Sequence, residues 1–231
     1  MAKLGVLAVA PVLICLMYMY IRDKYEKEPW RLLAVGVVFG AVLTFVIVRV
    51  QGVVAGFMPI VGQLGEAVYM SFAVASLVEE GFKFLVLFLL TWRNHNLNER
   101  LDGIVYAVFI SLGFAAVENV LYVFSPQMGG LDTALMRAVV SVPAHGLFGV
   151  MMGYYFALAK FEPQKRGRHM FNGFFVPWAA HGVYNTILLS GYTYALVVFA
   201  PFLIMLWISG LKKIKAHLAA SPFKPTSRQA G

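Results

Sequence analysis

The sequence predicts an all-α fold, a polytopic membrane helix bundle with about seven transmembrane helices. Its composition is the first observation, because 60% of the 231 residues are hydrophobic and only 13% are charged. A soluble domain carries about 25% charged residues, so this chain could not cover a water-exposed surface. The second observation is a series of long apolar segments, and the third is the gathering of Lys and Arg in the links between them.

A helix needs about 20 apolar residues to span the hydrocarbon core. Segments of about that length occupy residues 4–21, 32–50, 64–92, 103–124, 134–159, 171–190 and 192–210. The first segment resembles a signal peptide, but no small-residue cleavage site follows it, so we expect a retained helix. Around residues 53–63 the chain leaves room for an extra interfacial or re-entrant segment.

The links alternate in charge. Lys and Arg occur in links 22–31, 93–102 and 160–168 and in the tail from Lys212, whereas links 51–63 and 125–133 contain neither. Basic links lie in the cytoplasm of membrane proteins, so the N-terminus is predicted outside and the C-terminus inside. The net charge of +8 then reflects topology and contact with anionic membrane lipid, and it predicts no nucleic-acid partner.

No flexible linker or repeat divides the chain. We therefore expect a single transmembrane domain over residues 1–220 and a short cytoplasmic tail over residues 221–231. The single cysteine, Cys15, has no partner for an intrachain disulfide, and we interpret it as a packing residue.

A few ionisable side chains lie at depth, well inside the apolar segments. They are Glu79, Glu80, Lys83, Glu118, His145 and His181. A charge at the centre of a membrane helix costs from about 2.5 to more than 10 kcal/mol, so such residues usually serve a function. With a rise of about 1.5 Å per residue, these residues reach the middle or outer half of the bilayer from four helices. They predict one shared site.

Helical spacing suggests how these groups are divided. Glu79 and Lys83 are four residues apart and share a helix face, so we expect Lys83 to form a structural ion pair with Glu79. Glu80 is rotated about 100° away, which makes it the better candidate for a general base.

Two further helices carry polar groups next to helix-bending or small residues. His181 and Asn185 share a face, and Pro177, one turn earlier, kinks that helix and opens space beside them. In the preceding segment, Gly149 and Gly153 form a small-residue strip suited to close helix packing, either within the bundle or between chains. That strip lies on the same face as His145 and directs it into the bundle.

Glutamate and histidine around a cavity can bind Zn²⁺ and activate water, or glutamate can activate water directly as a general base. Both routes lead to hydrolysis. The sequence lacks His-Glu-x-x-His and Gly-x-Ser-Gly, and all its aspartates lie in links. The alternative function is a proton- or cation-coupled carrier, which also uses buried carboxylates and histidines.

Four motifs in order carry a resemblance to a known family. Glu79-Glu80-Gly81-Phe82-Lys83 fits Glu-Glu-x-x-Lys, Phe114 to Asn119 fits Phe-x-x-x-Glu-Asn, and His145 and His181 stand in the third and fourth motifs. The chain resembles the PrsW family of bacterial membrane proteases, within the superfamily of CAAX-prenyl endopeptidases. The resemblance extends over nearly the whole chain.

The resemblance implies site-1 cleavage of a single-span anti-sigma factor, outside the bacterial cell membrane, in an envelope-stress response. It marks Glu79, Glu80 and His181 as essential catalytic residues, and Glu118 and His145 as further members of the site. The candidate metal ligands, for a possible Zn²⁺, are Glu80, Glu118, His145 and His181; a metal-free mechanism stays open. Asn185 departs from a relative that has Asp there, and we expect it to orient His181 or to bond an oxyanion.

Overall fold

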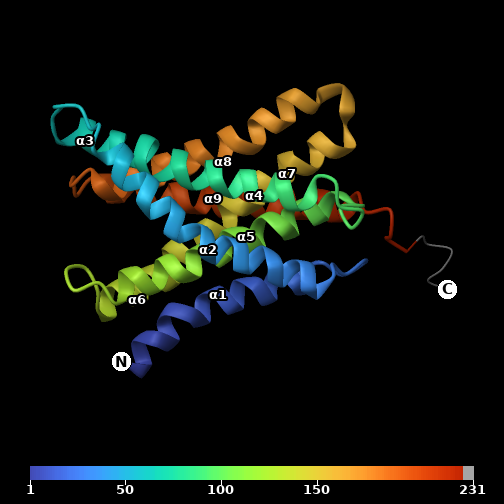
Figure 1. Cartoon of the computed structure of the whole chain (residues 1–231), viewed down its shortest axis with the longest axis horizontal. Coiled ribbons are helices and arrows are strands. Elements are labelled where there is room, and N and C mark those ends of the chain that lie inside the picture. The colour runs from blue at the N-terminus through green and yellow to red at the C-terminus, as the bar shows by residue number, and fades with distance from the viewer. Residues whose placement is uncertain (226–231) are drawn as a thin grey trace.

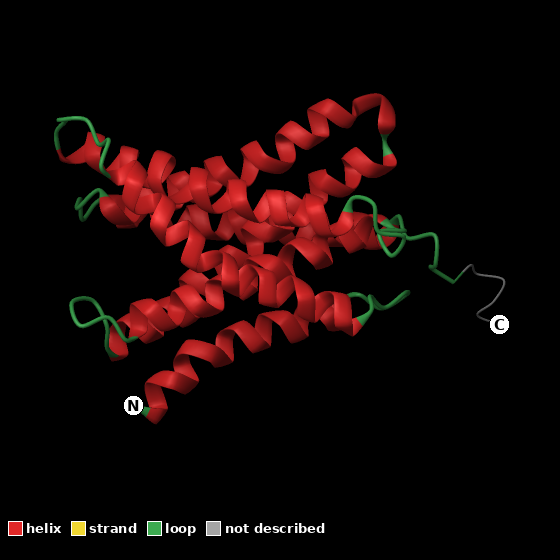
Figure 2. Ribbon diagram, in the orientation of Figure 1, coloured by secondary structure: helices red, strands yellow, loops and turns green. Residues whose placement is uncertain are grey.

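The computed structural model describes residues 1–225, and all regular secondary structure in that range is helical (Figures 1 and 2). This confirms the predicted all-α class; residues 226–231 of the predicted tail lie outside the described range. The elements are α1 (Ala2–Arg22), α2 (Trp30–Ala55), α3 (Gln63–Tyr69), η1 (Met70–Ser76), α4 (Leu77–Thr91), α5 (Arg100–Val123), α6 (Leu131–Met136), η2 (Arg137–Ser141), α7 (Val142–Phe161), η3 (Pro163–Lys165), α8 (Arg166–Leu189) and α9 (Ala195–Ala219).

Within residues 1–225, directly consecutive elements join into seven continuous helical segments, and each overlaps one predicted apolar segment. Of these segments of the described chain, 5 have the length and apolar composition needed to cross a membrane. The chain is therefore a multi-pass membrane protein. The other two segments contain several of the polar residues predicted to form the site, which lower their hydropathy: segment 63–91 contains Glu79, Glu80 and Lys83, and segment 163–189 contains His181 and Asn185. The count of about seven crossings stays a prediction.

The links lie at two opposite ends of the bundle (Figure 1). Loops 56–62, 124–130 and 190–194 lie at one end, which we call the neutral end because they contain no Lys or Arg. The loops after α1, α4 and α7 lie at the other, basic end. This grouping is the one that the predicted topology requires. The possible extra segment near residues 53–63 contains no helix of its own, because α2 continues to Ala55 and an exposed loop follows.

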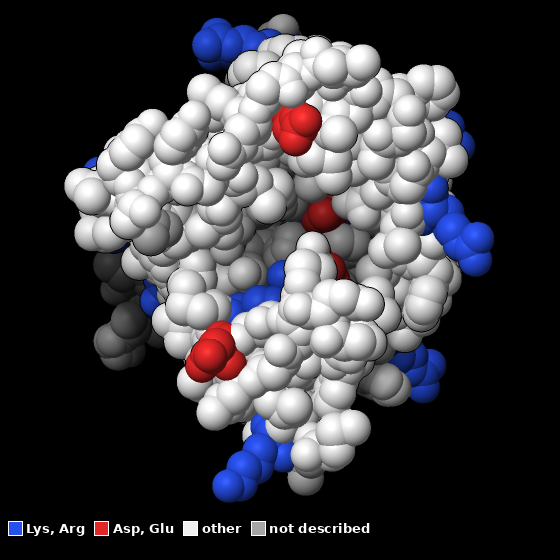
Figure 3. All heavy atoms as spheres, turned by 90° about the vertical axis from the view of Figure 1, so that its left-hand side faces the viewer, with Lys and Arg blue, Asp and Glu red and all other residues white. Residues whose placement is uncertain are grey.

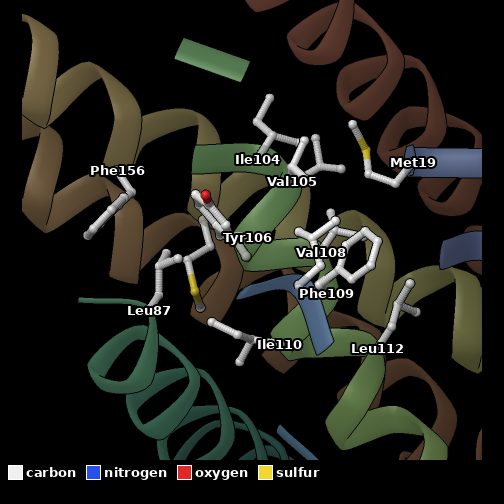
Figure 4. Close-up of a cluster of buried hydrophobic side chains, with 14 of the residues drawn as sticks. Met19, Leu87, Ile104, Val105, Tyr106, Val108, Phe109, Ile110, Leu112 and Phe156 are labelled. Atoms are coloured by element: carbon white, nitrogen blue, oxygen red, sulfur yellow. The ribbon is translucent and has the colours of Figure 1, made fainter. Parts of the chain in front are cut away.

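Helix α5 is the centre of the bundle. Its residues from Leu101 to Ala115 are all buried, and α1, α2, α4, α7 and α9 pack around it. Figure 4 shows the apolar side chains of this cluster, with Ile104, Val108 and Leu112 on α5 and Leu87 and Phe156 on its neighbours. A helix surrounded in this way fixes the positions of the others, so the rest of the bundle is built on α5.

Helices α5 and α7 approach closely through glycine. A Cβ added at Gly149 would lie 3.0 Å from the carbonyl oxygen of Ala107, and one added at Gly153 would overlap the carbonyl oxygen of Gly103. Helices in a membrane associate through such close packing, since apolar burial gives little advantage over lipid. The predicted small-residue strip is thus used within the chain.

Two π-helical turns, η1 and η2, run without a break into α4 and α7. A π-helical turn holds more residues than an α-helical one, so it rotates the residues after it to another face, and such turns are frequent at functional sites. The indole nitrogen of Trp178 on α8 donates a hydrogen bond of 3.0 Å to the carbonyl oxygen of Phe72 inside η1. η1 ends three residues before Glu79, and η2 ends four residues before His145. Both turns therefore help to set the direction of a predicted site residue.

Candidate active site

The predicted polar residues meet in the interior of the bundle. Lys83 on α4 lies at their centre, and its side chain is fully buried. Its Nζ atom is 2.9 Å from Glu80 Oε1, 3.3 Å from Glu79 Oε2 and 3.4 Å from His145 Nδ1. The same atom lies 4.1 Å from the centre of the Phe114 ring, within cation–π range. One ammonium group therefore contacts both glutamates.

This geometry corrects the expected division of the two glutamates. The contact between Lys83 and Glu79 is present, but Lys83 is closer to Glu80. Glu80 does not point away from Lys83 as expected. Glu80 is three residues before Lys83 and Glu79 is four before it, and both spacings place a residue on the same side of a helix. Lys83 thus does not single out Glu80 as the free carboxylate.

His181 links α8 to α4. Its Nδ1 atom is 2.9 Å from Glu80 Oε1 and 3.9 Å from Glu79 Oε2. Asn185, one turn later, donates from Nδ2 to His181 Nε2 at 3.1 Å, which places the His181 proton on Nδ1, facing Glu80. The ring of Phe148 stacks on the imidazole at 4.7 Å between centroids. The imidazole is held by contacts at both nitrogens and on one face.

His145 is held by a different carboxylate. Its Nε2 atom lies 2.9 Å from Glu118 Oε2, which also accepts a 2.6 Å bond from Arg137 Nη2. Arg137 Nε in turn donates to Asn119 Oδ1 at 2.7 Å. Glu118 and Asn119 are therefore anchored by the same arginine. With its Nε2 occupied by Glu118, His145 presents Nδ1 to the centre of the cluster.

A cavity of about 660 Å³ leads to this cluster. It is lined by the C-terminal parts of α2, α5 and α8 and by η1 and η2, all toward the neutral end. Seen from that end, the molecule has a central hollow with acidic and basic atoms inside it (Figure 3). Glu79, Glu118, His145, His181 and Asn185 line the cavity, whereas Glu80 and Lys83 lie behind its wall.

Comparison with known proteins identifies the family of this chain. Residues 28–208 match the model of the PrsW family of intramembrane metalloproteases. The chain belongs to that family. It is 37% identical to Protease PrsW of Clostridioides difficile strain 630, over 93% of this chain and 91% of the relative. It is 35% identical to Protease PrsW of Bacillus subtilis strain 168, over 90% of this chain and 92% of that relative. No solved structure matches the chain.

The PrsW family name implies a metal, and the residues present suit one. Ligand atoms of Glu79, Glu80, His145 and His181 lie within 4.8 Å of one another, and all four residues are buried. Glu80 Oε2 is buried without a hydrogen-bond partner among the described residues. The Lys83 ammonium lies among these atoms and already neutralises part of the charge of Glu79 and Glu80, so a bound metal would replace its contacts with those oxygens. Carboxylate oxygens and imidazole nitrogens are ligands that Zn²⁺ accepts.

Glu118 differs from the ligand set expected from the sequence. It is not part of the convergent group of ligand atoms, because its carboxylate faces Arg137 and His145 Nε2. A carboxylate behind a ligating histidine is a common arrangement at metal centres, where it fixes the ring. The geometry gives Glu118 this supporting position and brings Glu79 into the group instead.

The candidate site also contains residues that the sequence analysis did not select. Gln51 on α2 donates a 3.1 Å bond to Glu79 Oε1, and Arg137 holds Glu118. Arg137 lies at the start of the segment 134–159, and an arginine inside an apolar segment was a usable signal. Gln51 and Phe148 gave no such signal. Gln51 directly follows an apolar segment, and Phe148 cannot be distinguished by sequence from an ordinary apolar packing residue.

Proposed function

We propose that this protein is the endopeptidase that makes the site-1 cut in a single-span anti-sigma factor, as part of an envelope-stress response of the bacterial cell. The observation that carries the proposal is the cavity at the neutral end, with a buried group of glutamates and histidines at its base. With the N-terminus outside, that end faces the outer side of the membrane. Cleavage there shortens the outer part of the anti-sigma factor, so that later proteolysis frees the sigma factor.

The cavity wall suits the end of the membrane-spanning helix of a substrate protein. Apolar side chains of Val48, Leu121 and Leu188 line it together with the polar groups. An apolar wall accepts side chains from the end of a spanning helix, while polar groups at the base bind the backbone. A peptide bond at the outer boundary of a single-span protein therefore fits this cavity better than one in a folded soluble domain.

Glu79 is the general base in this proposal. Of the two adjacent glutamates, it is the one that lines the cavity, and Gln51 orients its Oε1 atom. Glu79 removes a proton from water as the water oxygen bonds to the carbonyl carbon, and then passes that proton to the leaving amine nitrogen as the peptide bond breaks. The structure thus favours the reverse of the order expected from helix geometry, with Glu80 as a buried partner of Lys83 and His181.

The negative charge that develops on the carbonyl oxygen needs donors. Asn185 lines the cavity, and its amide keeps one N–H free after bonding His181. Glu80, His145 and His181 would hold the metal of the family, with Glu118 positioning His145 and Glu79 left as the base. A bound Zn²⁺ polarises a carbonyl and lowers the pKa of water.

The family assignment favours this peptidase over the coupled carrier, since the matched family and the relatives are proteases. The test is cleavage of a candidate single-span anti-sigma factor by the purified protein in liposomes. We expect Glu79→Gln to lower the rate by at least about 100-fold, as for loss of a general base. Glu66→Gln is the matched control, because Glu66 is exposed on α3 outside the cavity. Full cleavage by folded Glu79→Gln protein would exclude Glu79 as the base.

A further inference from the structure

A second group of buried carboxylates lies at the basic end, far along the bundle from the active site. It joins the loop between α1 and α2 to the first turn of α5. Ligand atoms of Glu26, Glu28 and Asp102 lie within 4.8 Å of one another. Glu28 is 2% exposed and Asp102 is 0% exposed, while Glu26 is partly exposed. Carboxylates are rarely buried unless something compensates their charge.

The protein holds one oxygen of each buried carboxylate and leaves the other free. Asp102 Oδ2 accepts bonds from the backbone N–H groups of Asn98 and Glu99, at 2.8 and 2.6 Å. Glu28 Oε2 accepts a bond from the hydroxyl of Tyr106, one turn further along α5. These contacts fix the orientation of both carboxylates.

The remaining oxygens have no hydrogen-bond donor while the carboxyl groups are ionised, although the side chains of Glu28 and Asp102 are within hydrogen-bond reach of each other. Asp102 Oδ1, Glu28 Oε1 and Glu26 Oε2 are buried without a hydrogen-bond partner among residues 1–225. Nor does any described Lys or Arg form an ion pair with these three residues. An unpaired buried acceptor is destabilising, and more so when it is charged. Three such oxygens close together indicate a missing positive charge.

We propose that Glu26, Glu28 and Asp102 form a binding site for a hard divalent cation, Mg²⁺, Mn²⁺ or Ca²⁺, distinct from the catalytic centre. Oxygen-only ligands suit these ions, whereas the histidines of the active site suit zinc. The cation ties the link between α1 and α2 to α5, around which the other helices pack. The partial exposure of Glu26 gives the ion a path to solvent.

The competing occupant is a proton. The pKa of Glu28 is raised to about 10, mainly by burial and then by the charge of Asp102. A protonated Glu28 would relieve part of the repulsion without a metal. The two alternatives differ in a direct measurement, because only a cation site binds divalent metal with saturation.

The experiment uses the full-length protein in detergent after treatment with a chelator. Mn²⁺, Mg²⁺ and Ca²⁺ are titrated separately, with binding followed by calorimetry and stability by thermal unfolding. We expect saturable binding of at least one of these ions and a rise in Tm. Binding should weaken by at least about tenfold in Glu28→Gln and in Glu26→Gln, which removes a less buried ligand. It should be unchanged in Glu162→Gln, a matched change at the same end.

Binding by the Glu79→Gln variant separates this site from the active site. Retention of the Mn²⁺ or Ca²⁺ signal in Glu79→Gln, with its loss in Glu26→Gln, supports the proposal whatever the substrate of the enzyme. Three results overturn it: no saturable binding of any of the three ions, binding that survives both Glu26→Gln and Glu28→Gln, or binding that disappears in Glu79→Gln alone.

Discussion

Lys83 Nζ lies 2.9 Å from Glu80 Oε1 although both side chains are fully buried. Removing one member of a buried ion pair leaves an uncompensated charge, which costs about 3–5 kcal/mol. We therefore expect Lys83→Met to lower the stability in detergent by about that amount, measured by thermal unfolding. The double variant Lys83→Met with Glu80→Gln should recover part of the loss, since it removes both charges. Equal stability of the two variants would contradict this account.

Glu118 is expected to act through His145. Glu118→Gln keeps the shape of the side chain but removes the charge that faces His145 Nε2 and Arg137. Loss of a carboxylate behind a ligating histidine typically lowers metal affinity or activity by about 10–100-fold. We expect a lower kcat, a weaker zinc affinity and little change in KM. A normal zinc affinity and kcat in the folded variant would show that Glu118 does not position His145.

Metal removal tests the chemistry of the family in this chain. Dialysis against a chelator should abolish cleavage, and Zn²⁺ should restore it, because four buried residues offer convergent ligand atoms. His145→Ala should bind zinc more weakly, whereas His95→Ala, in an exposed loop, should bind it normally. Full cleavage by metal-free protein would leave the Glu79 mechanism standing and exclude a catalytic metal.

The contact between α5 and α7 leaves no room for a side chain at Gly153. Gly153→Ala would push its methyl group into the backbone of Gly103, and overpacking of this kind costs about 1–3 kcal/mol. Gly167→Ala is the control, because nothing lies within 4 Å of its added Cβ. Thermal unfolding in detergent should show a lower Tm for the first variant only; similar Tm values would contradict the close packing.

The orientation of the bundle can be tested with single cysteines in a Cys15→Ala background. Gln127 is exposed in a loop at the neutral end, and His95 is exposed in a loop at the basic end. In intact cells, a membrane-impermeant maleimide should label Gln127→Cys and not His95→Cys, because basic loops stay in the cytoplasm. The reverse pattern would invert the topology and move the proposed cleavage to the cytoplasmic side.

The local sequence predicts most of the helical architecture. Runs of about 20 apolar residues are long enough for a spanning helix, and each predicted run overlaps a continuous helical segment. The glycine strip also predicts a close contact, although only the structure identifies α5 as its partner. The possible extra segment near residues 53–63 was left open by the sequence, since an apolar loop and an apolar helical segment have similar compositions.

The roles within the site are harder to predict, because they depend on contacts between helices. Spacing along α4 predicts that Lys83 reaches Glu79, yet it gave Glu80 the wrong surroundings. Glu118 could not be separated from the candidate ligands by sequence alone. Its supporting position depends on Arg137, which is 19 residues away along the chain.

The sequence by itself determined the helices, the grouping of basic links at one end, and the set of glutamates and histidines buried among them. These features follow from composition and from periodicity within single helices. Only the tertiary structure decided that Glu79 faces the cavity, that Glu118 holds His145, and that the loop after α1 meets the start of α5 through carboxylates. The physical reason is that the rotation and depth of each helix depend on its packing around α5 and on the π-helical turns. The local sequence pattern predicts neither that packing nor those turns.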